Sequence, residues 1–364
     1  MSTLESVVLP SSPPSVGVVV PCYNYARYLS HNLNALLRQS DVDLDVVVVD
    51  DASSDSSHQV ARAFADRDGR VRVICHARNR GHIASYNEGL ELVRGDFVVL
   101  VSADDVLTPG SLARSARALA AHPSAGLAYG SAIQLHGDGE PEVHPIGARH
   151  RAALIHGEAW LARRCRRMTN TIFSPEAMLR RSVYEQIGPY DARLPHTGDF
   201  ALWLAASALS DVIQISAPAA FYRTHDSNMH DHTEQLHDAR THAMVFDLEQ
   251  RKTTVEITFA NPALPASVLR FRETALRRLA EEAFELACRA YTWGFVDTWP
   301  VDEIIAFGLS CRPDPRRSPA WQRYSIRRRA GVTRARRHPV FMIEEKLFDL
   351  GQGARRTIDR VVGA

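Results

Sequence analysis

The chain has 364 residues, of which 45% are hydrophobic and 23% are charged, and its formal net charge is +1. These fractions are those of an ordinary soluble globular protein. No apolar run approaches the ~20 residues that a bilayer-spanning helix needs, which argues against an integral membrane protein. The N-terminus lacks the basic and apolar stretches of a signal peptide, so we expect a cytoplasmic location.

Charge and cysteine are distributed in ways that bear on function. Residues 312–337 contain ten Arg and one Asp, which leaves the rest of the chain net acidic. The five cysteines are widely spaced and form no CxxC or Cys/His pattern, which argues against a zinc site. We expect them to be reduced thiols: Cys22, Cys75, Cys165, Cys288 and Cys311.

Strand-like and helix-like segments alternate through the first third of the chain. Residues 1–15 are rich in Ser and Pro and predict a disordered leader. After them, uninterrupted apolar runs alternate with segments whose apolar residues recur at helical spacing. The expected strands are 16–20, 44–49, 71–75 and 97–101, and the expected helices are 27–39, one from Ser53–Asp55 to Phe64, 82–94, and one opened by Thr108-Pro109.

This alternation indicates a parallel sheet covered by helices on both faces, a doubly wound α/β fold. Such sheets bind ligands beyond the carboxyl ends of their strands. Asp50-Asp51 and Asp104-Asp105 each follow an apolar strand. We therefore expect both pairs at one edge of the sheet.

The remainder of the chain has a more mixed pattern. The expected elements are strands over 127–135, 172–179 and 212–222, helices over 181–187 and 199–209, and a polar loop over 137–157. From about residue 228 nearly every segment is helical in pattern. We therefore predict a 16–227 domain with halves 16–120 and 121–227, followed by a helical C-terminal region, 228–364, that carries the basic segment 312–337.

Asp104-Asp105 is the strongest candidate for chemistry. Two buried neighbouring carboxylates repel each other and normally need a compensating cation. Mg²⁺ or Mn²⁺ is commonly held by one or two carboxylates together with substrate phosphates. The alternative is a solvated turn whose acids cap the next helix. The position after a buried strand, with Asp50-Asp51 two strands earlier, favours the metal.

Four ordered motifs resemble the inverting family 2 glycosyltransferases with the GT-A fold: VVVPCYNYARYL, VVVVDDASSD, NRGHIASYNEGL and GDFVVLVSADDVL. The resemblance covers roughly residues 16–227. It implies a sugar donor with a nucleotide diphosphate, of UDP or dTDP type, and Mg²⁺ or Mn²⁺ as cofactor. The implied acceptor bears a hydroxyl and is a saccharide, a lipid-linked saccharide or a small molecule.

The resemblance also implies roles for individual residues. Asp105 would ligate the metal, and Asp104 would touch the ribose or the sugar. Many members have Asp where this chain has Ser102, but the two following acids preserve the metal site. The implied contacts to the nucleoside are Pro21, Tyr23 and Asn24, with Asp50 or Asp51 at the base and Asn87 near the nucleotide.

Two downstream segments extend the predicted site. Asp199 stands at the start of an apolar helix, where it could serve as an N-cap, whereas the resemblance implies a general base for the acceptor hydroxyl. The segment FYRTH resembles the family's Tyr-Arg-x-His pattern. It implies His225 beside the diphosphate and metal, and Arg223 on phosphate oxygens.

Several alternatives stay open from the sequence. A nucleotidyltransferase would need a Gly-rich phosphate loop where this chain has PCYNYAR, and a non-catalytic sugar-nucleotide-binding module would not need intact Asp105 and Asp199. The basic segment 312–337 is a solvated face, a peripheral membrane contact at the inner face of the membrane, or a surface for a homo-oligomer. We expect no nucleic acid, because few aromatic residues interleave with the arginines.

Overall fold

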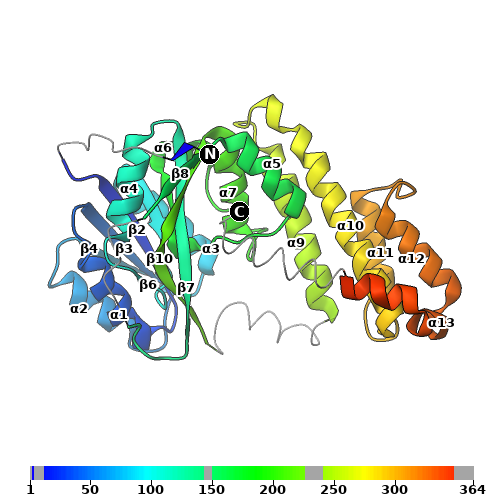
Figure 1. Ribbon diagram of the computed structural model, residues 1–364. Helices are drawn as coiled ribbons and strands as arrows, with labels where there is room; N and C mark the ends of the chain where they lie inside the picture. Colours follow the sequence, from blue (N-terminus) through cyan, green and yellow to red (C-terminus); the bar gives the residue numbers. More distant parts are fainter. Residues whose placement is uncertain (1, 4–11, 143–149, 226–240, 348–364) are drawn as a thin grey trace. The chain divides into compact units, whose positions relative to one another are not determined.

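The computed structural model (Figure 1) describes residues 2–3, 12–142, 150–225 and 241–347. The chain divides into two compact units. Unit 1 comprises Met1–Arg164, Thr169–Asn228 and Ala260–Leu269, and unit 2 comprises Cys165–Met168, Met229–Phe259 and Arg270–Ala364. The boundary expected near residue 228 falls within 226–240, outside the described residues.

Unit 1 is organised around one mixed sheet, to which ten strands belong within the described residues. The order is β1-β8-β10-β7-β9-β5-β2-β3-β4, and β6 pairs with β10. The strands are β1 (Ser2–Thr3), β2 (Ser15–Cys22), β3 (Asp43–Asp50), β4 (Val71–Cys75), β5 (Phe97–Leu100), β6 (Val106–Leu107), β7 (Ala125–His136), β8 (Ala152–Ile155), β9 (Ala177–Arg180) and β10 (Asp211–Thr224).

The first half of unit 1 is parallel, as the sequence predicts. Strands β5, β2, β3 and β4 pair in parallel. Strands β7 and β10 form a second parallel pair. Strand β9 joins the two groups, because it runs antiparallel to both β5 and β7. The predicted α/β fold is confirmed, with antiparallel pairs added in the second half.

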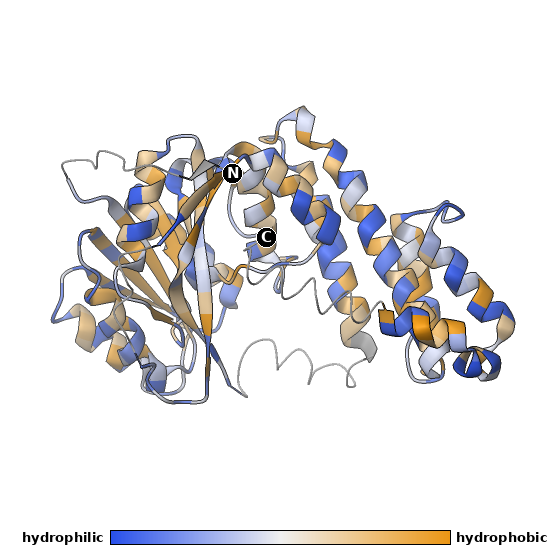
Figure 2. Cartoon of the chain, in the orientation of Figure 1, coloured by the Kyte–Doolittle hydropathy of each residue, from blue (hydrophilic) through white to orange (hydrophobic). Residues whose placement is uncertain are grey.

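Helices cover both faces of this sheet (Figure 1). Helices α1, α2 and α4 share one apolar core with the face of β2 that carries Val18 and Val20. Helix α3 packs on the opposite face, where Gly89 approaches Val19 and Val49. Figure 2 shows hydrophobic colouring along the strands between these layers. The helices of unit 1 are α1 (Ala26–Leu37), α2 (Ser57–Ala65), α3 (His82–Leu92), α4 (Ser111–Ala121), most of α5 (Gly157–Arg167), α6 (Arg181–Ile187) and α7 (Gly198–Leu209), with 3-10 turns η1 (Ser174–Glu176) and η2 (Ala266–Val268).

The structure differs from the expected elements at several places, and it contains β6 and α5, which the sequence reasoning did not predict. Strand β8 lies inside the predicted loop 137–157, because the edge of β10 offers it a hydrogen-bonding partner. The strand expected from 172 begins only at Ala177, after the Pro-containing turn η1. Helix α2 begins at Ser57, because Asp55 accepts hydrogen bonds from Ser57 and from Ala26 N.

A further difference concerns the predicted disordered leader. Ser2–Thr3 forms strand β1, which pairs with the free edge of β8. Strand β2 already begins at Ser15. Residues 1, 4–11 and 143–149 lie outside the described residues.

Unit 2 is helical in the described residues, which confirms the predicted C-terminal region. Its core includes an edge-to-face pair of Phe284 and Trp321, whose ring centroids are 5.1 Å apart. None of the described helices is both long and apolar enough to cross a membrane. The helices are most of α9 (Thr241–Ala260), α10 (Arg270–Trp293), α11 (Val301–Cys311), α12 (Pro319–Ala330) and α13 (Val332–Arg337), and residues 339–347 are also helical.

Candidate active site

The carboxyl ends of β2, β3 and β5 bring the two aspartate pairs to one edge of the sheet. Ala103 N donates to Pro21 O on one side of β2 at 3.2 Å, and Asp51 N donates to Cys22 O on the other at 2.9 Å. The end of β2 therefore separates Asp50-Asp51 from Asp104-Asp105. This is the arrangement that the predicted topology required.

Strand β10 brings the FYRTH segment to Asp104-Asp105. Phe221 pairs with Val106 in the antiparallel contact between β10 and β6. Arg223 N donates to Asp105 Oδ1 at 3.0 Å, and Arg223 Nε donates to the carbonyl oxygen of Asp104 at 2.9 Å. His225 Nε2 lies 3.2 Å from Asp104 Oδ2. Residues more than a hundred positions apart thus meet at the predicted site.

The aspartate pair is deeply buried, and its electrostatics fit a divalent cation. Asp104 is 5% exposed and Asp105 is 2% exposed. Burial and the charge of Asp104 raise the pKa of Asp105 well above its ordinary value, although Arg223 opposes the shift. Asp104 Oδ1 is buried and has no hydrogen-bond partner among the described residues. A cation would compensate both features.

The protein alone supplies few ligands for such a cation. In the described part of the chain, no group of three or more His, Cys, Asp or Glu side chains converges as a metal site. Mg²⁺ and Mn²⁺ tolerate this, because substrate phosphates and water complete their coordination. Asp104 and Asp105 are therefore a suitable set for an ion that arrives with a phosphate.

Arg223 and His225 are held in an aromatic and carbonyl environment. Arg223 is completely buried, and its Nη1 donates to Gly137 O at 2.6 Å and Gly139 O at 2.9 Å. Its guanidinium therefore anchors the loop after β7, and the predicted phosphate contact stays a prediction. His225 stacks on Tyr28 with centroids 5.1 Å apart and meets Tyr25 edge-on at 5.7 Å.

Tyr25 and Tyr28 are site residues that the sequence reasoning missed. Burial and the charges of Asp104 and Asp105 raise the pKa of Tyr25. The guanidinium of Arg223 lies 4.6 Å from the ring centroid of Tyr28. Both tyrosines belong to the motif that suggested the resemblance, so their position in that motif was an available signal.

The two acids after β3 have different surroundings. Asp51 accepts hydrogen bonds from Arg80 N and Gly81 N, each at 2.8 Å, and its Oδ1 lies 2.6 Å from His76 Nδ1. Asp51 therefore holds the turn that leads into α3. The Asp50 carboxylate accepts hydrogen bonds from the backbone N of Ser53 at 3.4 Å and from the Ser53 hydroxyl.

The end of β2 and the turn after it contain the residues that are predicted to contact the nucleoside. Tyr23 is 47% exposed. Asn24 adopts a left-handed conformation with φ 59°, and its side-chain oxygen accepts from Ser54 N at 2.8 Å. Pro21 is buried at the end of β2. These residues line the same edge as the aspartate pairs, and their contacts to a ligand stay predictions.

Asp199 lies in the first turn of α7, where two hydroxyl groups orient it. Tyr190 Oη donates to Asp199 Oδ1 at 2.7 Å, and Ser174 Oγ donates to Asp199 Oδ2. Thr197, rather than Asp199, occupies the N-cap position of the helix. Sequence reasoning missed Ser174 and Tyr190, because no local pattern links them to Asp199.

Asn87 contacts the Asp199 side of the site. Its Nδ2 donates to Tyr190 O at 2.9 Å, and its Oδ1 accepts from Tyr190 N at 2.8 Å. This pairing positions the tyrosine whose hydroxyl holds Asp199. Both polar groups of the Asn87 side chain are thus engaged by the protein, and the predicted contact to the nucleotide stays a prediction.

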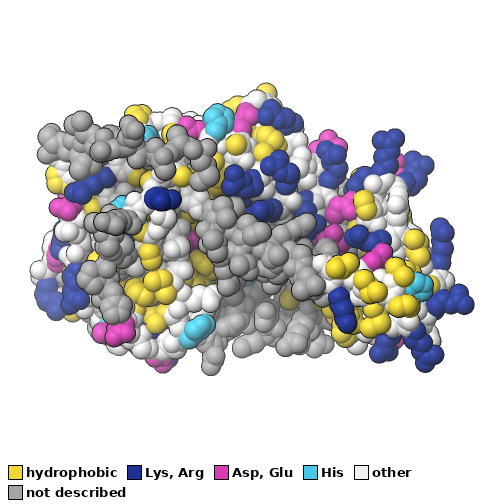
Figure 3. All heavy atoms as spheres, viewed as in Figure 1, with side chains coloured by type: hydrophobic (Ala, Val, Ile, Leu, Met, Phe, Trp, Pro, Cys, Tyr) yellow, Lys and Arg dark blue, Asp and Glu magenta, His cyan; other side chains and the backbone are white. Residues whose placement is uncertain are grey.

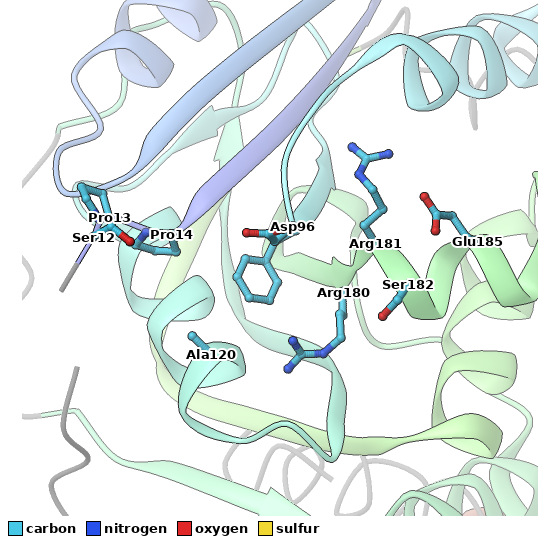
Figure 4. A pocket seen from close by; sticks show the side chains of 10 residues that line it. Ser12, Pro13, Pro14, Asp96, Ala120, Arg180, Arg181, Ser182 and Glu185 are labelled. Atoms are coloured by element: carbon cyan, nitrogen blue, oxygen red, sulfur yellow. The ribbon is translucent and has the colours of Figure 1, made fainter. Parts of the chain in front are cut away.

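A cavity of about 470 Å³ lies at the opposite, amino end of the parallel strands (Figure 4). It includes none of the predicted site residues. Arg180 donates to the carbonyl oxygens of Leu119, His122 and Ala125, so its guanidinium stabilises the connection between α4 and β7. The cavity is therefore separate from the candidate active site. Its lining is Ser12, Pro13, Pro14, Asp96, Phe97, Ala120, Arg180, Arg181, Ser182 and Glu185.

Comparisons with known proteins concern the domain that contains these residues. Residues 17–188 match the model of the family described as glycosyl transferase family 2. An uncharacterized glycosyltransferase of Nostoc sp. is 28% identical over 228 residues, which are 59% of this chain and 66% of that protein. The glycosyltransferase GlyG of Streptococcus pneumoniae is 36% identical over 93 residues, which are 25% of this chain and 31% of that protein. The matches thus span less than two thirds of the length of these relatives.

Solved structures show the same fold. The structure of S. aureus TarS 1-349 in complex with UDP has a TM-score of 0.57 and 17% sequence identity, covering 89% of each chain. The complex of TarS 1-349 with UDP-GlcNAc has a TM-score of 0.52 and 16% identity, covering 82% of this chain and 92% of that one. The family match, the relatives and the shared fold agree with the four motifs and the aspartate edge of the sheet. Residues 17–188 therefore form a domain that matches glycosyl transferase family 2, and the described sheet has a GT-A-like fold.

Proposed function

We propose that this enzyme transfers a sugar from a nucleotide-diphosphate donor of UDP or dTDP type to an acceptor hydroxyl, with inversion and with assistance from Mg²⁺ or Mn²⁺. The observation that carries the donor assignment is the buried Asp104-Asp105 pair, in which Asp104 Oδ1 has no partner among the described residues. The UDP and UDP-GlcNAc complexes of TarS support a uridine donor.

Asp104 and Asp105 would hold the cation. When bound, the ion would neutralise the negative charge that develops on the departing diphosphate. His225 stands beside Asp104 and is a further candidate ligand. Arg223 positions this group by holding Asp105 through its backbone N–H.

Asp199 is the proposed base. It would accept the proton of the acceptor hydroxyl while that oxygen forms a bond to the anomeric carbon, and the bond to the diphosphate oxygen breaks on the opposite face. The hydroxyl groups of Ser174 and Tyr190 support this role, because they fix the orientation of both carboxylate oxygens. General-base assistance is worth about 10²–10⁴ in rate.

A ligand-dependent thermal-shift experiment tests the donor site. UDP, dTDP, GDP and their sugars are added to the wild type, Asp105→Ala and Asp199→Asn, with and without Mn²⁺. We expect metal-dependent stabilisation by a uridine or thymidine nucleotide, of about 2.7 kcal/mol at a hundred times Kd. Asp105→Ala should lose this stabilisation, whereas Asp199→Asn should keep it.

The same variants test the base by hydrolysis or transfer of the donor sugar. Asp199→Asn should lower turnover by about 10²-fold or more while it still binds donor. Stabilisation of Asp105→Ala equal to that of the wild type would refute the metal assignment. Wild-type turnover by Asp199→Asn would refute the base.

We also propose that the basic segment 312–337 contacts an anionic lipid surface, which would suit a lipid-linked acceptor. Figure 3 shows Arg and Lys side chains beside hydrophobic ones over the C-terminal helices. Basic residues attract anionic lipid, and the transfer of aliphatic side chains from water to the lipid is favourable in free energy. The exposed basic residues of this segment are Arg316, Arg317, Arg328, Arg329, Arg334, Arg336 and Arg337, and nearby exposed aliphatic residues are Ile326, Val340, Ile343 and Leu347.

A further inference from the structure

An aromatic pair joins the residue that precedes η1 to strand β10. The rings of Phe173 and Tyr222 stack with centroids 4.2 Å apart and an interplanar angle of 23°. Phe173 precedes the turn η1, and Tyr222 belongs to β10. Their stacking joins the segment that orients Asp199 to the strand that holds Asp105.

The position of Tyr222 follows from strand register. Phe221 pairs with Val106 between the antiparallel strands β10 and β6, which places Tyr222 level with Asp105. The next residue, Arg223, donates its backbone N–H to Asp105. The ring of Tyr222 therefore begins beside the proposed donor carboxylates.

The position of Phe173 follows from a hydrogen bond of its backbone and from one made by the next residue. Its backbone N donates to Glu176 Oε1 at 2.9 Å, which fixes the turn. The adjacent Ser174 donates its hydroxyl to Asp199. Phe173 is nevertheless 37% exposed. Single exposed apolar residues are common, but this ring stacks on Tyr222, and the residue that follows it donates to Asp199.

We infer that Phe173 and Tyr222 form the floor of the acceptor subsite and that the acceptor presents a pyranose ring to it. This inference rests on the proposed function, because the attacking hydroxyl must lie between the donor carboxylates and Asp199. One face of a pyranose carries mainly C–H groups, which pack well on an aromatic ring and leave the hydroxyl groups on its edge free. Asp199 then reaches an edge hydroxyl while the ring rests on Phe173.

Saturation-transfer NMR with methyl pyranosides tests the inference. The gluco-, galacto-, manno- and N-acetylglucosamine methyl glycosides are mixed with protein, UDP and Mn²⁺. We expect at least one glycoside to receive saturation on the C–H protons of one ring face. The open-chain polyol sorbitol, which has similar hydroxyl groups but no ring, should receive much less.

Variants of Phe173 provide the matched comparison. Phe173→Trp keeps an aromatic surface and should retain the glycoside signal, whereas Phe173→Leu keeps an apolar side chain and should weaken glycoside binding about three- to tenfold. The UDP signal should be the same in all variants, which also shows that each is folded. Absence of a glycoside signal while UDP binds, or equal signals in Phe173→Leu and the wild type, would overturn the inference. Absence of UDP binding by the wild type would instead refute the proposed donor.

Discussion

The carboxylates of unit 1 differ in hydrogen bonding and in pKa because their surroundings differ. Asp51 is satisfied by two backbone N–H groups and His76. Asp105 has a pKa raised by burial and by a neighbouring carboxylate. Glu176 is a third case: burial raises its pKa to about 8, while its carboxylate accepts from Phe173 N. Each carboxylate therefore has to be interpreted from its own contacts.

Glu176 predicts a pH-dependent stability. Its pKa is higher in the folded protein than the ordinary 4.5, so the folded state holds a proton that the unfolded state loses above that pH. The contribution of Glu176 to the free energy of unfolding is therefore complete below about pH 4.5. It is lost as the pH rises to about 8, and the free energy of unfolding falls by up to about 1.4 kcal/mol per pH unit. Glu176→Gln should therefore gain stability relative to the wild type between pH 5 and pH 8.

Urea unfolding at several pH values measures this difference. Glu185→Gln is the matched control, because Glu185 is exposed and its variant should follow the wild type across the range. A difference between Glu176→Gln and the wild type that is constant from pH 5 to pH 8 would contradict the assignment.

At the scale of elements, helix α3 packs closely on the sheet. The turn before this helix is the one whose backbone N–H groups donate to Asp51. A Cβ atom at Gly89 would lie 2.3 Å from Val19 Cγ1 and 3.2 Å from Val49 Cγ2. Helix α3 can approach β2 and β3 only because this residue has no side chain. The same helix carries Asn87, which pairs with Tyr190.

Gly89→Ala should therefore destabilise the protein. Alanine normally favours a helix over glycine by about 1 kcal/mol, but overpacking a core typically costs about 1–3 kcal/mol. We expect a net loss of about 1–2 kcal/mol in the free energy of unfolding. Gly69→Ala is the control, because its Cβ would meet no atom within 4 Å. Denaturant unfolding that shows equal stability for both variants would refute the close approach.

At the scale of the whole molecule, the two units differ in composition and chemistry. Unit 1 contains the predicted site residues, and unit 2 contains the Arg-rich helices. One of these arginines has a structural role, because Arg327 is buried and donates to Thr292 Oγ1 and Glu344. Within the basic segment, some arginines therefore stabilise the packing of the helices, and others are exposed to solvent.

We predict that the exposed arginines of the basic segment 312–337 bind anionic vesicles. Protein should sediment with phosphatidylserine-containing vesicles but not with neutral phosphatidylcholine vesicles, and added salt should weaken the binding. Arg328→Gln/Arg329→Gln should weaken binding about thirtyfold, given about 1 kcal/mol for each of the two basic residues. Arg62→Gln/Arg67→Gln, at exposed sites of unit 1, should behave like the wild type. Equal binding to both kinds of vesicle would exclude an electrostatic contact.

Much of the fold was predictable because its signals are local. Uninterrupted apolar runs identified β2, β3 and β5, and helical spacing identified α1 and α3. Strand β8 was not predictable, since its four residues gain their hydrogen bonds from β10, far along the chain. The start of α2 was also missed, because Asp55 is engaged by Ala26 N, a partner from another segment.

The candidate site divides in the same way. The amino-acid sequence by itself determined the family resemblance, the parallel half of the sheet and the edge on which Asp50-Asp51 and Asp104-Asp105 lie, because strand ends and short motifs are local properties. Only the tertiary structure decided which groups these acids contact. Ser174 and Tyr190 meet Asp199, and Tyr222 stacks on Phe173, through pairings between distant segments. Contacts of that kind depend on register and packing, which no local pattern encodes.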